Sequence, residues 1–265
     1  MGFIIEEHDR QSRGFYTTLI DTTSRSILGN VFASAKEGYR EENETLSEYR
    51  GIMSGASIGI YGKEIDSKKG VGSLILEHTL DKVKSRFKDQ EHHMDHVERY
   101  SVAIGKALGV QGDELKELAL AAKLHDVGKA FIDPDILNKP GKLAKEEMET
   151  IKKHPEIGYW LLKGDKRYRK LAKYIRHHHE RWDGLGYPGG LKSEEIPLFS
   201  RIISVADAYD AMTTKRVYQK TKSREEAFRE LIEHSGTQFD TKIVKVFVEK
   251  VLLKFPNIYN EKTHY

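Results

Sequence analysis

Eight of the twelve histidines of this chain lie between residues 92 and 179, around the pair His125-Asp126 at the end of an apolar helical stretch. Neutral imidazole and carboxylate together suit divalent iron, manganese, zinc and nickel. A carboxylate also has a second oxygen with which it can bridge two neighbouring ions. The layout therefore predicts a metal site, and with its surrounding residues a metal-dependent hydrolase.

The composition excludes several other classes of site. The chain has no cysteine, which removes disulfides, thiolate zinc sites, cysteine-ligated clusters and a cysteine nucleophile. A net charge of only +3 gives no sign of DNA or RNA binding. Residues 1–13 lack the pattern of a signal peptide, and no apolar run approaches the ~20 residues of a spanning helix. We therefore expect a cytoplasmic protein without a membrane partner.

Helical spacing predicts which side chains between residues 92 and 126 can share an ion. His92 and His96 are four residues apart, so both can reach one ion from one helical face. His93, between them, is expected to point elsewhere. His125 and Asp126 diverge by roughly 100°, which suits two neighbouring ions with the Asp126 carboxylate between them.

Two later segments can complete such a site. His177, His178 and His179 are consecutive, so at most two of them can face one centre from a helix. Asp207 and Asp210 share a helical face, so one can bind a metal while the other orients a ligand or a histidine. The histidine run alone could be a solvated polar run, whereas Asp207, in an otherwise apolar helix, is hard to explain without a charged partner. Their joint occurrence favours the metal site.

The elements that must position these residues change character near residue 70. Before it, Thr-, Ile-, Val-, Tyr- and Gly-rich segments around a charged run predict a small α+β regulatory or contact module over residues 1–70. A linker helix is expected over 71–88. Apolar positions then follow helical spacing, which predicts a mainly α domain with helices over 114–124, 145–162, 168–179, 199–213, 224–235 and 241–254.

The motifs resemble one family in their order and spacing. They are HVER at 96–99, LHDVGK at 124–129, ILNKPGKL at 136–143, HPEIG at 154–158, HHERWDGLGYP at 178–188 and ADAYDAMT at 206–213. This pattern is similar to the HD-GYP domain, the bacterial branch of the HD phosphohydrolase superfamily that hydrolyses cyclic di-GMP. The resemblance implies an HD-domain helical bundle with C-terminal GYP-type helices over residues 89–258.

The resemblance also implies a ligand set for two divalent ions. The ligands are His96, His125, Asp126 and Asp207 for one ion, and Asp126, His154, His178 and His179 for its neighbour. Iron or manganese is expected, with nickel, cobalt or zinc as alternatives. Family members with a third ion place a glutamate four residues before the first histidine. His92 stands at that position here, so a third ion stays open.

The substrate contacts that the resemblance implies are Lys129, Tyr187, Asp210 and Arg216. Lys129 matches a lysine beside the scissile phosphate, where an ammonium offsets developing negative charge. With Asp126 it forms the expected catalytic pair. The planar fork of arginine can donate two hydrogen bonds to a phosphodiester.

The activity implied is hydrolysis of cyclic di-GMP to linear pGpG, and with a third ion to GMP, by a metal-bridging hydroxide. Another cyclic dinucleotide, such as cyclic GMP-AMP, is an alternative substrate. A non-hydrolysing cyclic-dinucleotide receptor is a second alternative, against which the intact His125-Asp126 pair and Lys129 argue. A hydrolase of ordinary nucleotides is a third, against which the loop at 186–188 argues. A homodimer, or a signalling partner of the N-terminal module, stays open.

Overall fold

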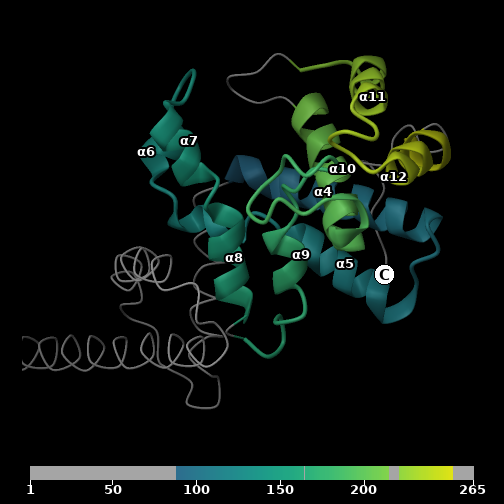
Figure 1. Cartoon of the computed structure of the whole chain (residues 1–265), viewed down its shortest axis with the longest axis horizontal. Coiled ribbons are helices and arrows are strands. Elements are labelled where there is room, and N and C mark those ends of the chain that lie inside the picture. The colour runs from purple at the N-terminus through teal and green to yellow at the C-terminus, as the bar shows by residue number, and fades with distance from the viewer. Residues whose placement is uncertain (1–87, 164, 215–220, 253–265) are drawn as a thin grey trace, which may run out of the picture. The chain divides into compact units, whose positions relative to one another are not determined.

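The computed structural model describes residues 88–163, 165–214 and 221–252, with side chains from residue 92 onward (Figure 1). All lie in Gly72–Tyr265, one of two compact units of the chain. The helices are α4 Lys88–Ala107, α5 Gly112–Leu124, α6 Pro134–Leu137, α7 Lys145–Ile151, α8 His154–Lys163, α9 Ala172–Arg176, α10 Leu198–Thr213, α11 Arg224–Glu233 and α12 Thr241–Val246. Shorter turns are the 3₁₀ segments η2 Val127–Phe131 and η3 Ser193–Glu195 and the π-helical η4 Phe247–Leu252. These described residues form no β-strand, so the predicted mainly α bundle is confirmed for this part of the chain.

A buried apolar seam holds α4 against α10 and η4. Val97, Tyr100 and Ile104 follow one another at helical spacing on α4, and all three are buried. The Tyr100 ring lies edge-on to Tyr209 of α10 and Phe247 of η4, with ring centroids 5.1 and 5.8 Å apart. Such aromatic pairs contribute about 0.5–1.5 kcal/mol each beyond their area burial. The seam therefore determines which face of α4 packs against α10.

The single helix predicted over 145–162 is wrong, because the structure has two helices there. Pro155 has no N–H, so it cannot donate to the carbonyl of Ile151 as a residue of a continuous helix would. The His154 ring takes that place, with Nδ1 2.8 Å from the Ile151 carbonyl oxygen. The break puts His154 at the first position of α8.

The remaining helices agree with the sequence pattern to different degrees. Those predicted over 114–124, 199–213 and 224–235 correspond to α5, α10 and α11 within two residues at either end. The range 241–254 is divided between α12 and η4. The helix predicted over 168–179 is too long, because α9 ends at Arg176 and the three histidines that follow lie in a turn.

Some predictions fall outside the described residues. These are the N-terminal module over 1–70, the linker helix over 71–88 up to its last residue, and Arg216. Within the described ranges, no helix combines the length and the apolar character that crossing a membrane requires.

Close backbone contact between η2 and α8 depends on Gly128. A Cβ at this position would overlap the carbonyl oxygen of His154 and would lie 2.8 Å from the amide nitrogen of Gly158. Both obstacles are backbone atoms, so no side chain can move aside to make room. The contact places Asp126, two residues before Gly128, beside the start of α8.

We expect Gly128→Ala to separate η2 from α8 and to lower stability by at least about 1–3 kcal/mol, the usual cost of overpacking. Thermal unfolding and metal content per chain should both fall. Gly105→Ala on α4 is a matched control, because its Cβ would meet side chains and no backbone atom, with Leu118 Cδ2 at 2.6 Å and Leu115 Cδ1 at 3.3 Å. The control should lose some stability and keep its metal. A Gly128→Ala protein with an unchanged melting temperature and metal content would contradict this requirement.

Candidate metal centre

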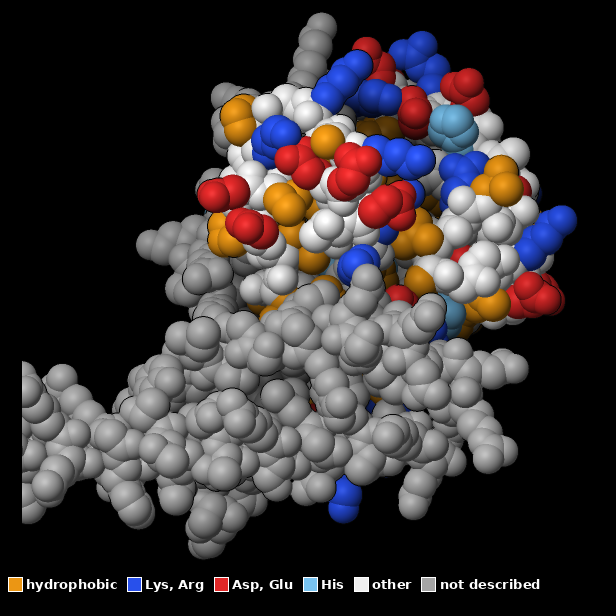
Figure 2. All heavy atoms as spheres, turned by 60° about the vertical axis from the view of Figure 1, so that its left-hand side comes forward, with side chains coloured by type: hydrophobic (Ala, Val, Ile, Leu, Met, Phe, Trp, Pro, Cys, Tyr) orange, Lys and Arg blue, Asp and Glu red, His pale blue; other side chains and the backbone are white. Residues whose placement is uncertain are grey.

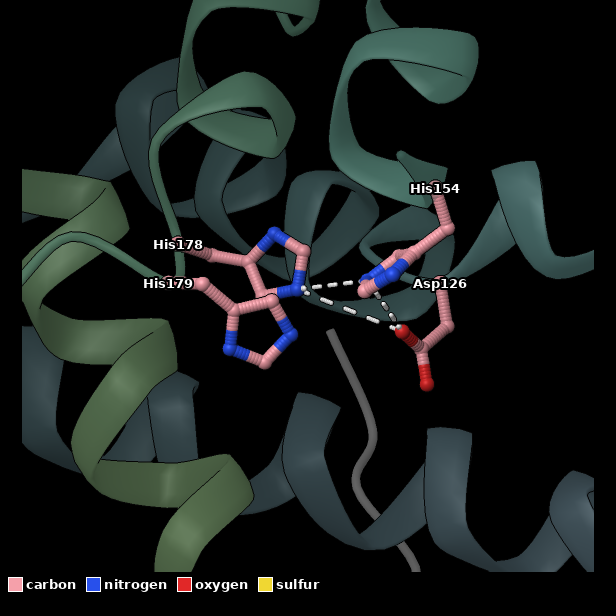
Figure 3. Close-up of side chains that lie close together, drawn as sticks. All are labelled: Asp126, His154, His178 and His179. Carbon is pink, nitrogen blue, oxygen red and sulfur yellow. Dashed lines mark hydrogen bonds and ion pairs between the residues drawn. The ribbon is translucent and has the colours of Figure 1, made fainter. Parts of the chain in front are cut away.

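Asp126 points its two carboxylate oxygens toward different partners. Oδ1 lies 3.1 Å from His154 Nε2 and 4.0 Å from His178 Nε2. Oδ2 lies 3.4 Å from His125 Nε2 and 2.6 Å from Lys129 Nζ. Figure 3 shows the Asp126 and His154 side chains directed toward the two adjacent imidazoles of the His178–His179 turn. One carboxylate therefore serves two sides of a single centre.

The side chains around Asp126 form two groups of ligand atoms. In each group, one atom from every residue lies within 4.8 Å of the others. The first ligand group is Asp126, His154, His178 and His179, and the second ligand group is His93, His125 and Asp207. In the second group, Asp207 Oδ1 lies 3.3 Å from His93 Nε2 and 3.9 Å from His125 Nε2. His93 Nε2 is also 3.8 Å from Asp126 Oδ2. The structure thus brings together six of the seven firm ligands expected from the sequence, all except His96.

Three of the histidines are held in the same way, at helix ends. The last carbonyls of a helix have no partner within it. At the ends of α5, α7 and α9, a histidine ring supplies one. The pairs are His125 Nδ1 with Ala122 O at 2.7 Å, His154 Nδ1 with Ile151 O at 2.8 Å and His178 Nδ1 with Ile175 O at 2.6 Å. A carbonyl only accepts, so each Nδ1 carries a proton, and in the neutral ring Nε2 keeps the lone pair that can bind a metal.

His93 is oriented by a carboxylate instead of a carbonyl. Its Nδ1 lies 2.6 Å from Asp210 Oδ2. Asp210 also accepts from Thr214 Oγ1 at 2.7 Å and from His96 Nδ1 at 2.8 Å. The Asp210 side chain is 0% exposed, and its role as a substrate contact stays a prediction. The other role considered for the Asp207/Asp210 pair, orienting a histidine, fits these contacts.

The ligand groups contain His93, whereas the sequence predicted His96 as the metal ligand on α4. His93 is buried, whereas His92 is exposed and the His96 side chain is 24% exposed. The i,i+4 spacing of His92 and His96 shows that they share a face, but it does not show which face is buried. The apolar seam decides that question, because His93 precedes Val97 by four residues and Tyr100 by seven. Neither His92 nor His96 belongs to a ligand group among the described residues.

Two buried atoms in this centre lack the partners that such atoms need. His125 Nε2 and Asp126 Oδ1 make no hydrogen bond with any described residue, although Asp126 Oδ1 lies close to His154. Leaving a buried polar atom unpaired costs about 1–3 kcal/mol. The two ligand groups together offer five imidazoles and two carboxylates. This donor set fits divalent metal ions, which would satisfy both atoms.

The protonation states of Asp126, His178 and His179 suit a metal. Burial lowers the pKa of His178 well below its ordinary value, and that of His179 to about 3. Burial alone would raise the pKa of Asp126, but the Lys129 ammonium holds it well below its ordinary value. Neutral imidazoles and an ionised carboxylate are the forms that bind divalent ions.

His93 differs in holding a proton. Burial alone would lower its pKa, but hydrogen bonds to Asp207 and Asp210 raise it to about 9. An ion binding at Nε2 must displace this proton, so metal affinity at this position increases with pH up to that value.

Two further predicted substrate contacts, Lys129 and Tyr187, lie beside the ligand groups. Lys129 contacts the Asp126 carboxylate and keeps a 21% exposed side chain. The Tyr187 ring stacks on His179, with centroids 5.0 Å apart and 23° between the ring planes. The backbone N–H of Tyr187 also donates to the His179 carbonyl at 3.2 Å.

A family model described as "HD domain" matches residues 75–243. The chain therefore belongs to the HD domain family. The resemblance predicted from the motifs is confirmed.

This HD domain is 42% identical over 170 residues to a cyclic di-GMP phosphodiesterase of Thermotoga maritima, over 62% of this chain and 46% of the relative. It is 37% identical over 169 residues to the 3′3′-cGAMP-specific phosphodiesterase 2 of Vibrio cholerae, over 63% of this chain and 32% of the relative. The chain thus spans less than half the length of each of these relatives.

A solved structure shows the same fold. The HD-G"Y"P protein of Bdellovibrio bacteriovorus superposes with a TM-score of 0.52 at 21% identity, over 82% of this chain and 81% of that one. At this identity the likeness supports the fold of the HD domain and leaves the chemistry to the site itself.

We expect His93→Ala to lower metal content by about one ion per chain, because it removes one of the three ligands of the second group. His92→Ala changes the adjacent, exposed histidine and should leave metal content unchanged. Elemental analysis of protein purified without oxygen measures both variants. Loss of an ion in His96→Ala, with full retention in His93→Ala, would show that His96 is the ligand, as the sequence predicted.

Proposed function

We propose that this HD domain is a metal-dependent phosphodiesterase that hydrolyses cyclic di-GMP to linear pGpG. The proposal rests on the position of the Asp126 carboxylate, which presents one oxygen to each of two ligand groups beside Lys129. Relatives named as cyclic di-GMP phosphodiesterases support the choice of substrate. Further cleavage to GMP stays a prediction, since His92 is exposed and apart from both ligand groups.

The proposed cofactors are two divalent ions, one for each ligand group. Iron or manganese is favoured because both accept mixed imidazole and carboxylate ligands, and cobalt, nickel and zinc share this donor set. When bound, such ions supply Lewis acidity, which lowers the pKa of water and offsets charge on phosphoryl oxygens. In this proposal the nucleophile is water, and no side chain forms a covalent intermediate.

Lys129 contributes positive charge at the phosphate. Its ammonium is held 2.6 Å from Asp126 Oδ2 and is partly exposed, so it is available to a substrate in the centre. A fixed cation in a partly buried site stabilises developing negative charge more strongly than one in water. We infer that Lys129 stabilises the transition state and contributes little to metal binding.

Tyr187 and Arg216 complete the proposed substrate site. Burial and the nearby carboxylate of Asp126 raise the pKa of Tyr187 above its ordinary value, so its phenol keeps its proton and can donate to a phosphoryl oxygen. Arg216 lies outside the described residues, and its contact with a phosphate is proposed from the family resemblance alone.

A second candidate substrate is cyclic GMP-AMP, favoured by the similarity to the 3′3′-cGAMP-specific enzyme of Vibrio cholerae. The non-hydrolysing receptor is disfavoured because the ligand groups and Lys129 are all in place.

On the face of the described residues presented in Figure 2, acidic and basic side chains are interspersed. The absence of a nucleic-acid partner, the cytoplasmic location and the homodimer all remain predictions.

Asp126→Ala and Lys129→Met should separate metal binding from chemistry. Asp126→Ala removes the carboxylate shared by both groups, so both ions should weaken and hydrolysis should vanish. Lys129→Met should keep the metals and lower kcat about a hundredfold, as expected for the loss of one group that stabilises transition-state charge. Chromatographic assays on cyclic di-GMP and cyclic GMP-AMP, paired with elemental analysis, measure these effects.

Lys123→Met provides the control, because this lysine also forms ion pairs, with Asp95 and Glu98, but lies on α5 outside the ligand groups. It should retain metals and activity. An Asp126→Ala protein with two ions and near-normal turnover would contradict the proposal. Fully metallated wild-type protein that binds either dinucleotide without hydrolysing it would favour the receptor.

A further inference from the structure

Glu180 directly follows two residues of the first ligand group, His178 and His179, yet it belongs to neither group. Its side chain is 0% exposed. A buried carboxylate is costly unless several donors satisfy it. Both of its oxygens accept hydrogen bonds, so the role of Glu180 differs from that of the neighbouring histidines in the first ligand group.

Three donors surround the Glu180 carboxylate. The backbone N–H of Gly189 donates to Oε1 at 2.7 Å, and that of Leu191 donates to Oε2 at 3.2 Å. The ring nitrogen Nδ1 of His177 lies 3.1 Å from Oε1. These contacts tie residues 189–191 back to the histidine turn, so they close the loop that contains Tyr187.

The loop also wraps closely around the backbone of Glu180. A Cβ at Gly186 would overlap the amide nitrogen of Arg181, and a Cβ at Gly189 would lie 3.0 Å from Glu180 Oε1. Tyr187 lies between these two glycines. Its N–H donates to the carbonyl of His179, and its ring stacks on the imidazole of the same residue. The position of this ring therefore depends on a loop whose far end is fixed by one carboxylate.

We propose that Glu180 is a positioning residue that holds Tyr187 against His179, and so sets substrate affinity without itself touching metal or substrate. The inference rests on the proposed function, in which Tyr187 contacts the cyclic dinucleotide. Glu180 acts on Tyr187 through the backbone of residues 186–191. It is distinct from a metal ligand, because both of its oxygens already accept hydrogen bonds.

Glu180→Gln is the sharpest substitution, because it keeps the size of the side chain while it removes the negative charge and turns one acceptor into a donor. The amide NH₂ replaces one acceptor and faces an N–H group, so one buried donor loses its partner. A loss of this kind weakens the fixed state of the loop by about tenfold or more. We expect KM for cyclic di-GMP to rise about tenfold, while kcat changes less than about twofold and metal content is unchanged.

The test compares Glu180→Gln, Tyr187→Ala and the double variant, each as the full chain loaded with manganese. If Glu180 acts through Tyr187, adding Glu180→Gln to Tyr187→Ala should change KM by less than about twofold. Hydrogen exchange of the peptide spanning 184–191 should be faster in Glu180→Gln. Glu195→Gln is the matched control, because Glu195 is exposed and accepts the Lys192 N–H at 2.9 Å farther along the same segment. It should match wild type in every readout.

Three results would overturn the inference: loss of an ion in Glu180→Gln, an unchanged KM, or fully additive effects in the double variant. If Glu180→Gln fails to fold, His177→Ala removes only one of the three donors and should raise KM in the same direction to a smaller extent. If metallated wild-type protein hydrolyses neither dinucleotide, the proposed function fails separately. Hydrogen exchange then decides the role of Glu180, and unchanged exchange in the variant overturns it.

Discussion

A carboxylate buried to 5% exposure must be surrounded by positive charge or by donors, and Asp126 obtains these from segments far apart in the chain. His125 and Lys129 come from the end of α5 and from η2, while His154 and His178 come from the start of α8 and the turn after α9. The packing of η2 on α8 at Gly128 allows this convergence. Moving any of these segments would leave a buried charge with fewer partners, so the site and the fold are stabilised together.

Helix ends perform most of the positioning in this domain. Where α5, α7 and α9 stop, each leaves carbonyls that need donors, and a histidine ring provides one in each case. The bond that completes the helix end also fixes the tautomer, which leaves Nε2 as the ligand atom. Local backbone chemistry therefore prepares these rings before any ion binds. His93, within α4, is oriented by the Asp210 carboxylate instead, which requires a second buried carboxylate.

The sequence predicted the ligand types and most of the ligands because adjacency and motif order constrain them strongly. His125, Asp126 and the 178–179 pair are fixed by their place in the motifs. The ligand groups depart from the prediction on α4, where three histidines lie within five residues and spacing alone cannot show which face is buried. Extending the apolar stripe of Val97 and Tyr100 backward would have selected His93. The role of Glu180 depends on hydrogen bonds to loop amides, and no side-chain pattern in the sequence reports those.

We propose that each oxygen of the Asp126 carboxylate serves one of two metal ions, one for each ligand group. Anomalous diffraction from crystals of anaerobically purified, manganese-loaded protein tests it most directly. Two peaks are expected about 3.5–4 Å apart, on either side of Asp126, as in two-metal sites generally. One should lie among His154, His178 and His179, and the other between His93 and Asp207. A single peak, or a second ion bound by His96 in place of His93, would contradict it.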